Sequence, residues 1–238
     1  MSREFALVHG MSHGAWCWEP LADRLERRGH RVVAVDLPGH GRRAHEWRTA
    51  SIGAYAAAVA TALAQAGFAR AVVVGHSMAG AVIPKVAELA PARVAHLVFL
   101  AAVVPQHGGR LLDHLPPATQ AMFRGLAASG AGRVQYPAVM EHARWMTDLA
   151  PGDARVVDAL ARLTPQPAAP WLETIDLARF LAMGVPRTYV RCLGDAAVTP
   201  DRAARYAARL GVTPIDLDTA HGPMLSDPGA LVRILERV

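Results

Sequence analysis

The chain has 238 residues, of which 52% are hydrophobic, and its 25 lysines and arginines outnumber its 20 acidic residues, for a formal net charge of +5. A chain of this length buries one large core and leaves little room for two, so we expect a single domain. Lys85 is the only lysine and the arginines are scattered, which argues against a nucleic-acid-binding surface.

Other compositional features argue against further classes. The longest unbroken apolar run covers residues 97–104, far short of the ~20 residues that a membrane-spanning helix needs. Cys17 and Cys192 are too few for a disulfide framework. No apolar stretch follows a basic N-terminus, so we expect a cytoplasmic protein with no membrane partner.

Short apolar runs alternate with longer segments that carry alanine and leucine at helical spacing. The predicted strands are 5–8, 31–35, 71–74, 95–101, 186–192 and 213–217, and the predicted helices are 18–28, 52–66, 78–89, 199–210 and 228–238. Gly29 and Gly67 follow the first two helices, where C-terminal caps are expected. Because the strands are apolar on both faces, they predict the mostly parallel central sheet of an α/β fold, with helices on both sides.

This alternation stops after residue 104 and resumes at Val185. The intervening segment is rich in proline and glycine and contains short helical pieces, such as 137–149 and 153–163. A segment of this kind inside a compact domain is typical of a lid. We therefore expect a core formed by residues 1–104 and 183–238, with a helical lid inserted over 105–182.

The strand at 71–74 ends in Gly75-His76-Ser77-Met78-Ala79 and is followed at once by a helix. A strand, Gly-x-Ser-x-small and a helix form the pattern of a nucleophile elbow, in which the serine hydroxyl stands clear of a sharp turn. Ala79 replaces the usual second glycine, a small departure that Gly80 can relieve. Ser77 is therefore the predicted nucleophile.

A serine hydroxyl needs a base to take its proton and an acid to orient that base, in the chain order Ser, Asp or Glu, His. Asp195 follows the strand at 186–192, and His221 follows the last strand. Both lie at the strand ends that carry Ser77, so they are the predicted acid and base. Asp201 fits the first turn of a helix better, while Asp216 and Asp218 are interpreted as exposed strand residues.

Two glycine-rich alternatives are weaker. A phosphate-binding P-loop requires Lys-Ser or Lys-Thr after its last glycine, whereas Gly80 is followed by two apolar residues. The segment from 5 to Asp36 imitates a dinucleotide-binding βαβ unit with its ribose acid, but its glycines are spaced G-x-x-x-G. No cofactor is expected.

The other histidines give no metal site. His9 and His13 have the i, i+4 spacing of a ligand pair, but they flank a turn and no carboxylate lies near them in sequence. His76 is interpreted as a packed neighbour of the elbow, and Cys192 as a small core residue. Seven more are interpreted as surface or loop residues: His30, His40, His45, His96, His107, His114 and His142.

The loop after the first strand suits a second role. Its backbone amide at Met11 is expected to join the amide of Met78 in an oxyanion hole. Around this site we expect an apolar pocket, and the candidate substrate-binding residues are His13, Val103, Trp145, Phe180 and Gly222.

Several of these motifs, taken in order across the whole chain, resemble the α/β-hydrolase superfamily. They are Leu7-Val8-His9-Gly10, Asp36-Leu37-Pro38-Gly39-His40-Gly41, Gly75 to Gly80, Gly194-Asp195 and Ala220-His221-Gly222-Pro223-Met224-Leu225. The stretch 8–18 is similar to the corresponding loop of the plant methylesterase and hydroxynitrile lyase branch. That resemblance implies a helical lid over the serine and hydrolysis of small carboxylic esters without a cofactor.

The lyases of that branch carry threonine at the position of Gly10 and lysine directly after the histidine, where this chain has Gly222. With no cation beside His221 to stabilise a leaving cyanide, an esterase or thioesterase is favoured. Two alternatives remain open: the same Ser-His-Asp set in a lyase, cyclase or acyl-transfer step, and a hydrolase-fold receptor. The expected partner is a small-molecule ester, and the oligomeric state is open, a homodimer included.

Overall fold

The structure is a computed structural model, which describes residues 2–129 and 131–238. Residue 1 of the predicted core and residue 130 of the predicted lid lie outside the described residues. The centre is a six-stranded sheet in the order β2-β1-β3-β4-β7-β8, in which every neighbouring pair is parallel. The strands are β1 (Glu4–Val8), β2 (Arg31–Val35), β3 (Ala71–His76), β4 (Val94–Leu100), β7 (Arg187–Cys192) and β8 (Ile215–Leu217). The predicted α/β fold and its six strands are confirmed.

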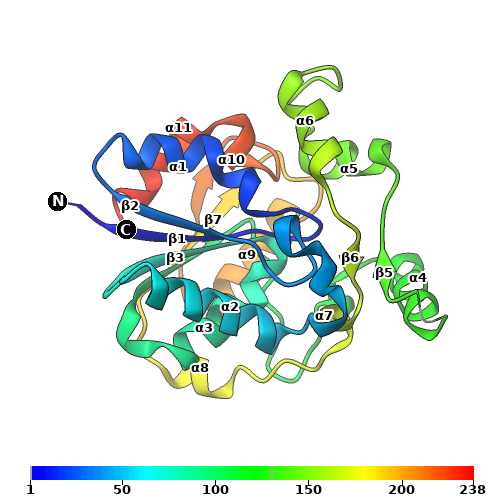
Figure 1. The fold of residues 1–238 in the computed structure, drawn as a ribbon, viewed down its shortest axis with the longest axis horizontal. Helices are drawn as coiled ribbons and strands as arrows, with labels where there is room; N and C mark the ends of the chain where they lie inside the picture. Colours follow the sequence, from blue (N-terminus) through cyan, green and yellow to red (C-terminus); the bar gives the residue numbers. More distant parts are fainter. Residues whose placement is uncertain (1, 130) are drawn as a thin grey trace.

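Helices cover both faces of the sheet (Figure 1). One face carries α1 (Glu19–Glu26), α10 (Pro223–Ser226) and α11 (Pro228–Leu235), and the other carries α2 (Ile52–Gln65) and α3 (Ile83–Leu89). Helix α9 (Pro200–Arg209) packs against β7. Strand β3 is buried along its whole length, as a central strand covered on both sides must be.

The predicted helix over 78–89 is divided in two. A short 3-10 helix, η3 (Ser77–Ala81), comes first, and the α-helix α3 begins only after Val82. Pro84 lies in the first turn of α3, where its missing N–H costs nothing. Three more 3-10 helices occur in the core, η1 (Ala15–Trp18), η2 (Gly41–Thr49) and η4 (Pro91–Arg93).

Between β4 and β7 the chain leaves the sheet and forms a largely helical segment. Its elements are η5 (Leu112–His114), α4 (Pro117–Ala128), β5 (Arg133–Val134), α5 (Ala138–Trp145), α6 (Ala154–Arg162), β6 (Gln166–Pro167), α7 (Ala169–Leu172) and α8 (Ala178–Ala182). Helices α4, α5 and α6 stand away from the sheet, at the right of Figure 1. Helix α8 instead packs against α3 on the flank of the sheet, because the chain must return there to enter β7.

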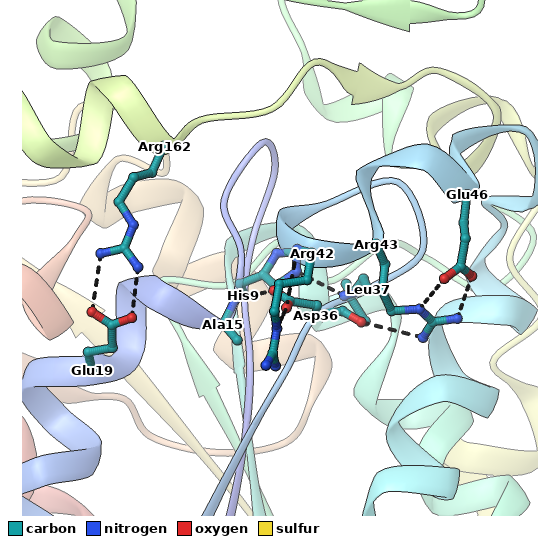
Figure 2. A network of polar contacts seen from close by, with 9 residues as sticks. All are labelled: His9, Ala15, Glu19, Asp36, Leu37, Arg42, Arg43, Glu46 and Arg162. Carbon is teal, nitrogen blue, oxygen red and sulfur yellow. Dashed lines mark hydrogen bonds and ion pairs between the residues drawn. The ribbon is translucent and has the colours of Figure 1, made fainter.

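Specific polar contacts hold this segment to the core. Arg162 at the end of α6 donates two hydrogen bonds to the Glu19 carboxylate, the shorter at 2.7 Å (Figure 2). The amide of Thr164 donates to the carbonyl of Ser12 at 2.9 Å, and the amide of Ala220 donates to the Asp148 carboxylate at 2.9 Å. Over the described ranges, no helix is both long and apolar enough to cross a membrane.

Candidate active site

Ser77 occupies the sharp turn between β3 and η3. Its φ is +54°, a left-handed conformation that costs a non-glycine residue roughly 1–3 kcal/mol and is typical of functional sites. It is also the one residue between 71 and 84 that is not buried. A hydroxyl that projects from an otherwise buried, strained turn is the geometry of a nucleophile elbow.

Small residues around the turn are required by close packing. A Cβ at Gly75 would lie 2.8 Å from a methyl carbon of Ile83, and one at Gly80 would lie 2.4 Å from the carbonyl oxygen of Val103. Ala79 is fully buried in the same turn. The tight position is therefore 80, and the alanine at 79 is accommodated.

Asp195 and His221 meet beyond the ends of β7 and β8. The Nδ1–H of His221 donates to Oδ2 of Asp195 at 2.6 Å, and both side chains are almost completely buried. The other carboxylate oxygen accepts two backbone N–H groups, from Ala197 and Val198, each at 2.7 Å. The acid is thus fixed from both sides, and it fixes the tautomer that leaves Nε2 of His221 as the acceptor.

The second ring nitrogen of His221 is the chemically available one. Its Nε2 is buried and makes no hydrogen bond within the described residues. His76, the residue before Ser77, donates its Nε2–H to the carbonyl of His221 at 2.8 Å, and the two ring centroids are 4.6 Å apart. His76 therefore ties the loop of His221 to the elbow. Burial holds the pKa of His76 well below its usual value, so it acts there as a neutral ring.

The loop after β1 lies directly against the elbow. A Cβ at Gly10 would come within 2.8 Å of the Cβ of Ser77, and Met11 and Ser77 line the same cavity. Met78 is in the first turn of η3, where backbone N–H groups lack intrahelical partners. The amides of Met11 and Met78 therefore belong to the two segments that flank the serine.

Two further contacts fix this loop. The amide of Ser12, whose φ is +60°, donates to Oε1 of Gln166 at 3.1 Å. Nε2 of His9 accepts the amide N–H of Leu37 at 3.1 Å (Figure 2), while its Nδ1–H donates to the carbonyl of Gly10 at 2.8 Å. Both nitrogens of His9 are thus used, and within the described residues no three His, Cys, Asp or Glu side chains gather as metal ligands.

The cavity beside Ser77 has a volume of about 320 Å³ and lies between the strand ends and the segment that joins β4 to β7. Of the expected substrate-binding residues, Val103 and Trp145 line it. The other lining residues are Met11, His114, Leu115, Pro116, Thr119, Met140, Arg144, Trp171, Ala196, Ala197, Val198 and Arg202. Most were not foreseen, because they come from five separate segments that share no sequence pattern.

His13 and Gly222 lie behind the lining. The ring of His13 stacks on Trp16 at 5.3 Å and contacts Trp145 at 4.7 Å, and burial lowers its pKa to about 4. A Cβ at Gly222 would lie 3.2 Å from the carbonyl oxygen of Trp145. Both residues support the Trp145 wall without facing the cavity.

Two further expectations do not match the structure. Phe180 is fully buried on α8, its ring is 6.4 Å from that of Phe99, and its amide donates to Glu88. It lies away from the cavity because α8 returns to the flank of α3. His40 is in a loop but is not on the surface: it is buried and its Nε2–H donates to Oε1 of Gln166 at 3.0 Å.

The dinucleotide alternative is also not supported. The buried carboxylate of Asp36 accepts the amide N–H of Ala15 at 2.7 Å and the Nε–H of Arg42 at 2.9 Å (Figure 2). A Cβ at Gly41 would lie only 2.1 Å from the same carboxylate. Asp36 therefore braces the loops after β1 and β2 and is not available to a ribose.

Comparison with known proteins agrees with this architecture. A family model described as alpha/beta hydrolase family matches residues 5–234. The chain belongs to that family. A solved extracellular α/β-hydrolase from a Paenibacillus species superposes with a TM-score of 0.89, at 24% identity, over 99% of this chain and 98% of that one. A pyrethroid hydrolase from Sphingobium faniae JZ-2 gives a TM-score of 0.78 at 25% identity, over 100% and 97%.

Proteins that are similar to this hydrolase chain in sequence include esterases. A carbendazim hydrolyzing esterase from Nocardioides sp. (strain SG-4G) is 36% identical over 126 residues, 51% of this chain and 52% of that protein. Methylesterase 7 of Arabidopsis thaliana is 28% identical over 98% of this chain and 95% of its own length. The chain thus spans about half the length of the first of these relatives, and its similarity to plant methylesterases runs through nearly its whole length.

Proposed function

We propose that this hydrolase is a serine esterase that cleaves small carboxylic esters, or thioesters, through an acyl-enzyme. The observation that carries the proposal is the state of His221. One ring nitrogen is held by the buried, fully hydrogen-bonded Asp195 at 2.6 Å, the other makes no hydrogen bond, and His76 ties the loop to the residue before Ser77. An oriented ring with a free nitrogen, in a loop that is tied to the strained serine turn, supports a role for His221 as the base that activates Ser77.

The chemistry follows in two balanced halves. His221 takes the proton of the Ser77 hydroxyl as Oγ bonds to the ester carbonyl carbon; the carbon–alkoxy bond then breaks, and His221 returns the proton to the departing alcohol. A water, deprotonated by the same ring, then attacks the acyl carbon; the bond from that carbon to Oγ breaks, His221 returns the proton to Oγ, and the carboxylic acid leaves. The amides of Met11 and Met78 hold the negative oxygen of each tetrahedral intermediate, each contributing about 3 kcal/mol.

The packing at Gly10 favours ester hydrolysis over cyanohydrin cleavage. The lyases that this chain resembles carry threonine there, but a Cβ at this position would lie 2.8 Å from the Ser77 Cβ and 3.0 Å from Nδ1 of His76. Gly222, directly after His221, supplies no cation. The relatives that carry the names esterase and methylesterase support the same choice.

Steady-state hydrolysis of short-chain aryl esters tests this proposal. We expect turnover by the parent, its loss in Ser77→Ala and His221→Ala, and a drop in kcat of about 10⁴ in Asp195→Asn, because the amide no longer fixes the imidazole tautomer. Asp216→Asn is the matched control: this carboxylate is exposed and pairs with Arg191 on the adjacent strand. Equal activity in Ser77→Ala and the parent would reject the proposal. Preferential acyl transfer to an added alcohol would instead identify the protein as an acyltransferase that uses the same residues.

A further inference from the structure

Two arginine side chains line the cavity that contains Ser77. Arg144 comes from the lid helix α5 and Arg202 from α9, and the cavity wall includes no aspartate or glutamate. Neither arginine forms an ion pair within the described residues, whereas surface arginines such as Arg162 and Arg191 do. The wall therefore carries two positive charges and no acidic side chain of its own.

The guanidinium of Arg202 is held in place by neutral acceptors. Its Nη1 donates to the carbonyl of Ala197 at 3.1 Å, and its Nη2 donates to the carbonyl of His114 and to the hydroxyl of Tyr206. That hydroxyl in turn donates to Nδ1 of His114 at 2.9 Å. These bonds use three of the five N–H donors of a guanidinium. An immobilised cation with unused donors loses little rotational freedom when it binds an anion.

The surroundings of His114 reflect the same excess of positive charge. Burial, followed by the charges of Arg209 and Arg202, lowers the pKa of His114 to about 4, so this lining ring is neutral. Arg209 lies behind the wall and donates to the carbonyl of Val104 at 2.6 Å. Positive charge therefore also lies behind the cavity wall on the side formed by α9.

Arg144 faces the same cavity from the lid. Its guanidinium lies 5.1 Å from the ring of Tyr136, an aromatic contact that leaves its charge in place. Glu141 lies on the same helix, and burial raises its pKa to about 7 against the opposing effect of Arg144. At neutral pH this carboxyl is therefore only partly ionised and offsets only part of the arginine charge.

We propose that the natural ester carries an anionic group, a carboxylate, separated from its scissile bond by a short apolar spacer, and that Arg202 and Arg144 bind this group while Ser77 attacks the ester. This inference rests on the esterase function proposed above. Guanidinium and carboxylate form short, strong charge-assisted hydrogen bonds. The cavity volume of about 320 Å³ is at the lower end of the ~300–1,000 Å³ of small-molecule sites, which favours a compact substrate.

Two pairs of esters test the anion proposal, and pH-stat titration measures the rate at which each ester is hydrolysed. In the first pair the charge is on the acyl half: monoethyl adipate is compared with its methyl ketone analogue, in which an acetyl group replaces the carboxylate. In the second pair the charge is on the alcohol half: the acetate ester of ω-hydroxyhexanoate is compared with its own methyl ketone analogue. The pair in which the anion is preferred identifies the half of the substrate that faces the arginines.

We expect one carboxylate ester to exceed its ketone analogue in kcat/KM by about tenfold or more, equivalent to about 1.4 kcal/mol. This ratio should fall toward one in Arg202→Met and decrease with salt, while Arg202→Lys should retain part of it. Because each ratio is taken within one variant, a general loss of folding does not imitate the effect. Arg205→Met, at an exposed arginine on the same helix, should keep the parental ratio.

Equal kcat/KM for both members of both pairs in the parent would overturn the anion proposal while leaving the esterase intact. A preference that survives unchanged in both Arg202→Met and Arg144→Met would also overturn it. If no ester of any kind is hydrolysed and Ser77 takes up no phosphonate, the esterase proposal itself fails, and this inference fails with it.

Discussion

At the residue scale, the turn at Ser77 depends on the absence of a side chain at Gly80. The Cβ of an alanine there would meet the carbonyl oxygen of Val103 at 2.4 Å. That oxygen belongs to a backbone segment that is itself bonded to the turn, since the Val103 amide donates to the Ser77 carbonyl at 2.9 Å. The two segments cannot separate without moving the serine.

Gly80→Ala is therefore expected to lower the free energy of unfolding by about 1–3 kcal/mol, the cost of overpacking, and to reduce ester hydrolysis. Urea unfolding followed by circular dichroism measures the first effect. Gly53→Ala is the control in helix α2, because the nearest atom to its new Cβ would be 3.9 Å away; it should stabilise the protein by about 0.4–1 kcal/mol. A neutral effect of Gly80→Ala would contradict the packing argument.

At the element scale, strand β6, in the segment between β4 and β7, supports the loop after β1. Oε1 of Gln166 accepts hydrogen bonds from the Ser12 amide and from His40, at 3.1 and 3.0 Å, and the side chain is fully buried. Ser12 directly follows Met11, whose amide is the proposed oxyanion donor. We therefore expect Gln166 to act as a positioning residue that reaches the site from the segment between β4 and β7.

Gln166→Leu should reduce kcat by roughly 10- to 100-fold with a smaller change in KM, because a displaced Met11 amide weakens transition-state binding more than substrate binding. The measurement is the separate determination of kcat and KM. Gln135→Leu, at an exposed glutamine of the same segment, is the matched control. The positioning role would be excluded by equal kinetic constants in the two variants.

The elements themselves were largely predictable. The inner strands β1, β3 and β4 follow from apolar runs, because a strand covered on both faces is largely apolar. The expectation of cover on both faces is wrong for the edge strand β8, in which Ile215 and Asp216 are exposed. The division of 78–89 into η3 and α3 was not predicted, because the helical spacing of apolar residues gives no sign of a tight turn at Ser77. The strands β5 and β6 have two residues each, which is too short for any periodic signal.

At the scale of the whole molecule, a group of buried neutral histidines surrounds the site. Burial lowers the pKa of His9, His13, His40 and His76, that of His13 to about 4. In the unfolded chain the same rings take up protons as the pH falls through about 6.5. Their contribution to stability is complete above that pH and is lost below it, by about 1.4 kcal/mol per pH unit for each ring that only the unfolded chain protonates.

The urea midpoint is therefore expected to fall between pH 7 and pH 5. Glu141 partly offsets this trend, because its folded pKa of about 7 lies above its unfolded value of about 4.3, and its contribution is lost as the pH rises. His13→Gln should flatten the dependence by about one proton, whereas His45→Gln, at an exposed ring, serves as the control. A midpoint independent of pH across this range would contradict the assignment.

The site was predictable only in part. Ser77, Asp195 and His221 could be chosen from sequence because parallel strands place the residues that follow them at one edge of the sheet. Arg144, Arg202 and Gln166 could not, because each is an isolated polar residue outside any motif. The chain between β4 and β7 brings Arg144 to the cavity and Gln166 to the loop after β1, whereas Arg202 reaches the cavity from the core helix α9.

The intact mass of the protein after exposure to a fluorophosphonate tests the central claim most directly. The account predicts a single phosphonyl adduct on the parent, no adduct on Ser77→Ala and greatly slowed labelling of His221→Ala, because only a serine activated by that ring attacks phosphorus at a useful rate. An unlabelled parent, or a Ser77→Ala variant labelled as fast as the parent, would contradict the assignment of Ser77 as an activated nucleophile.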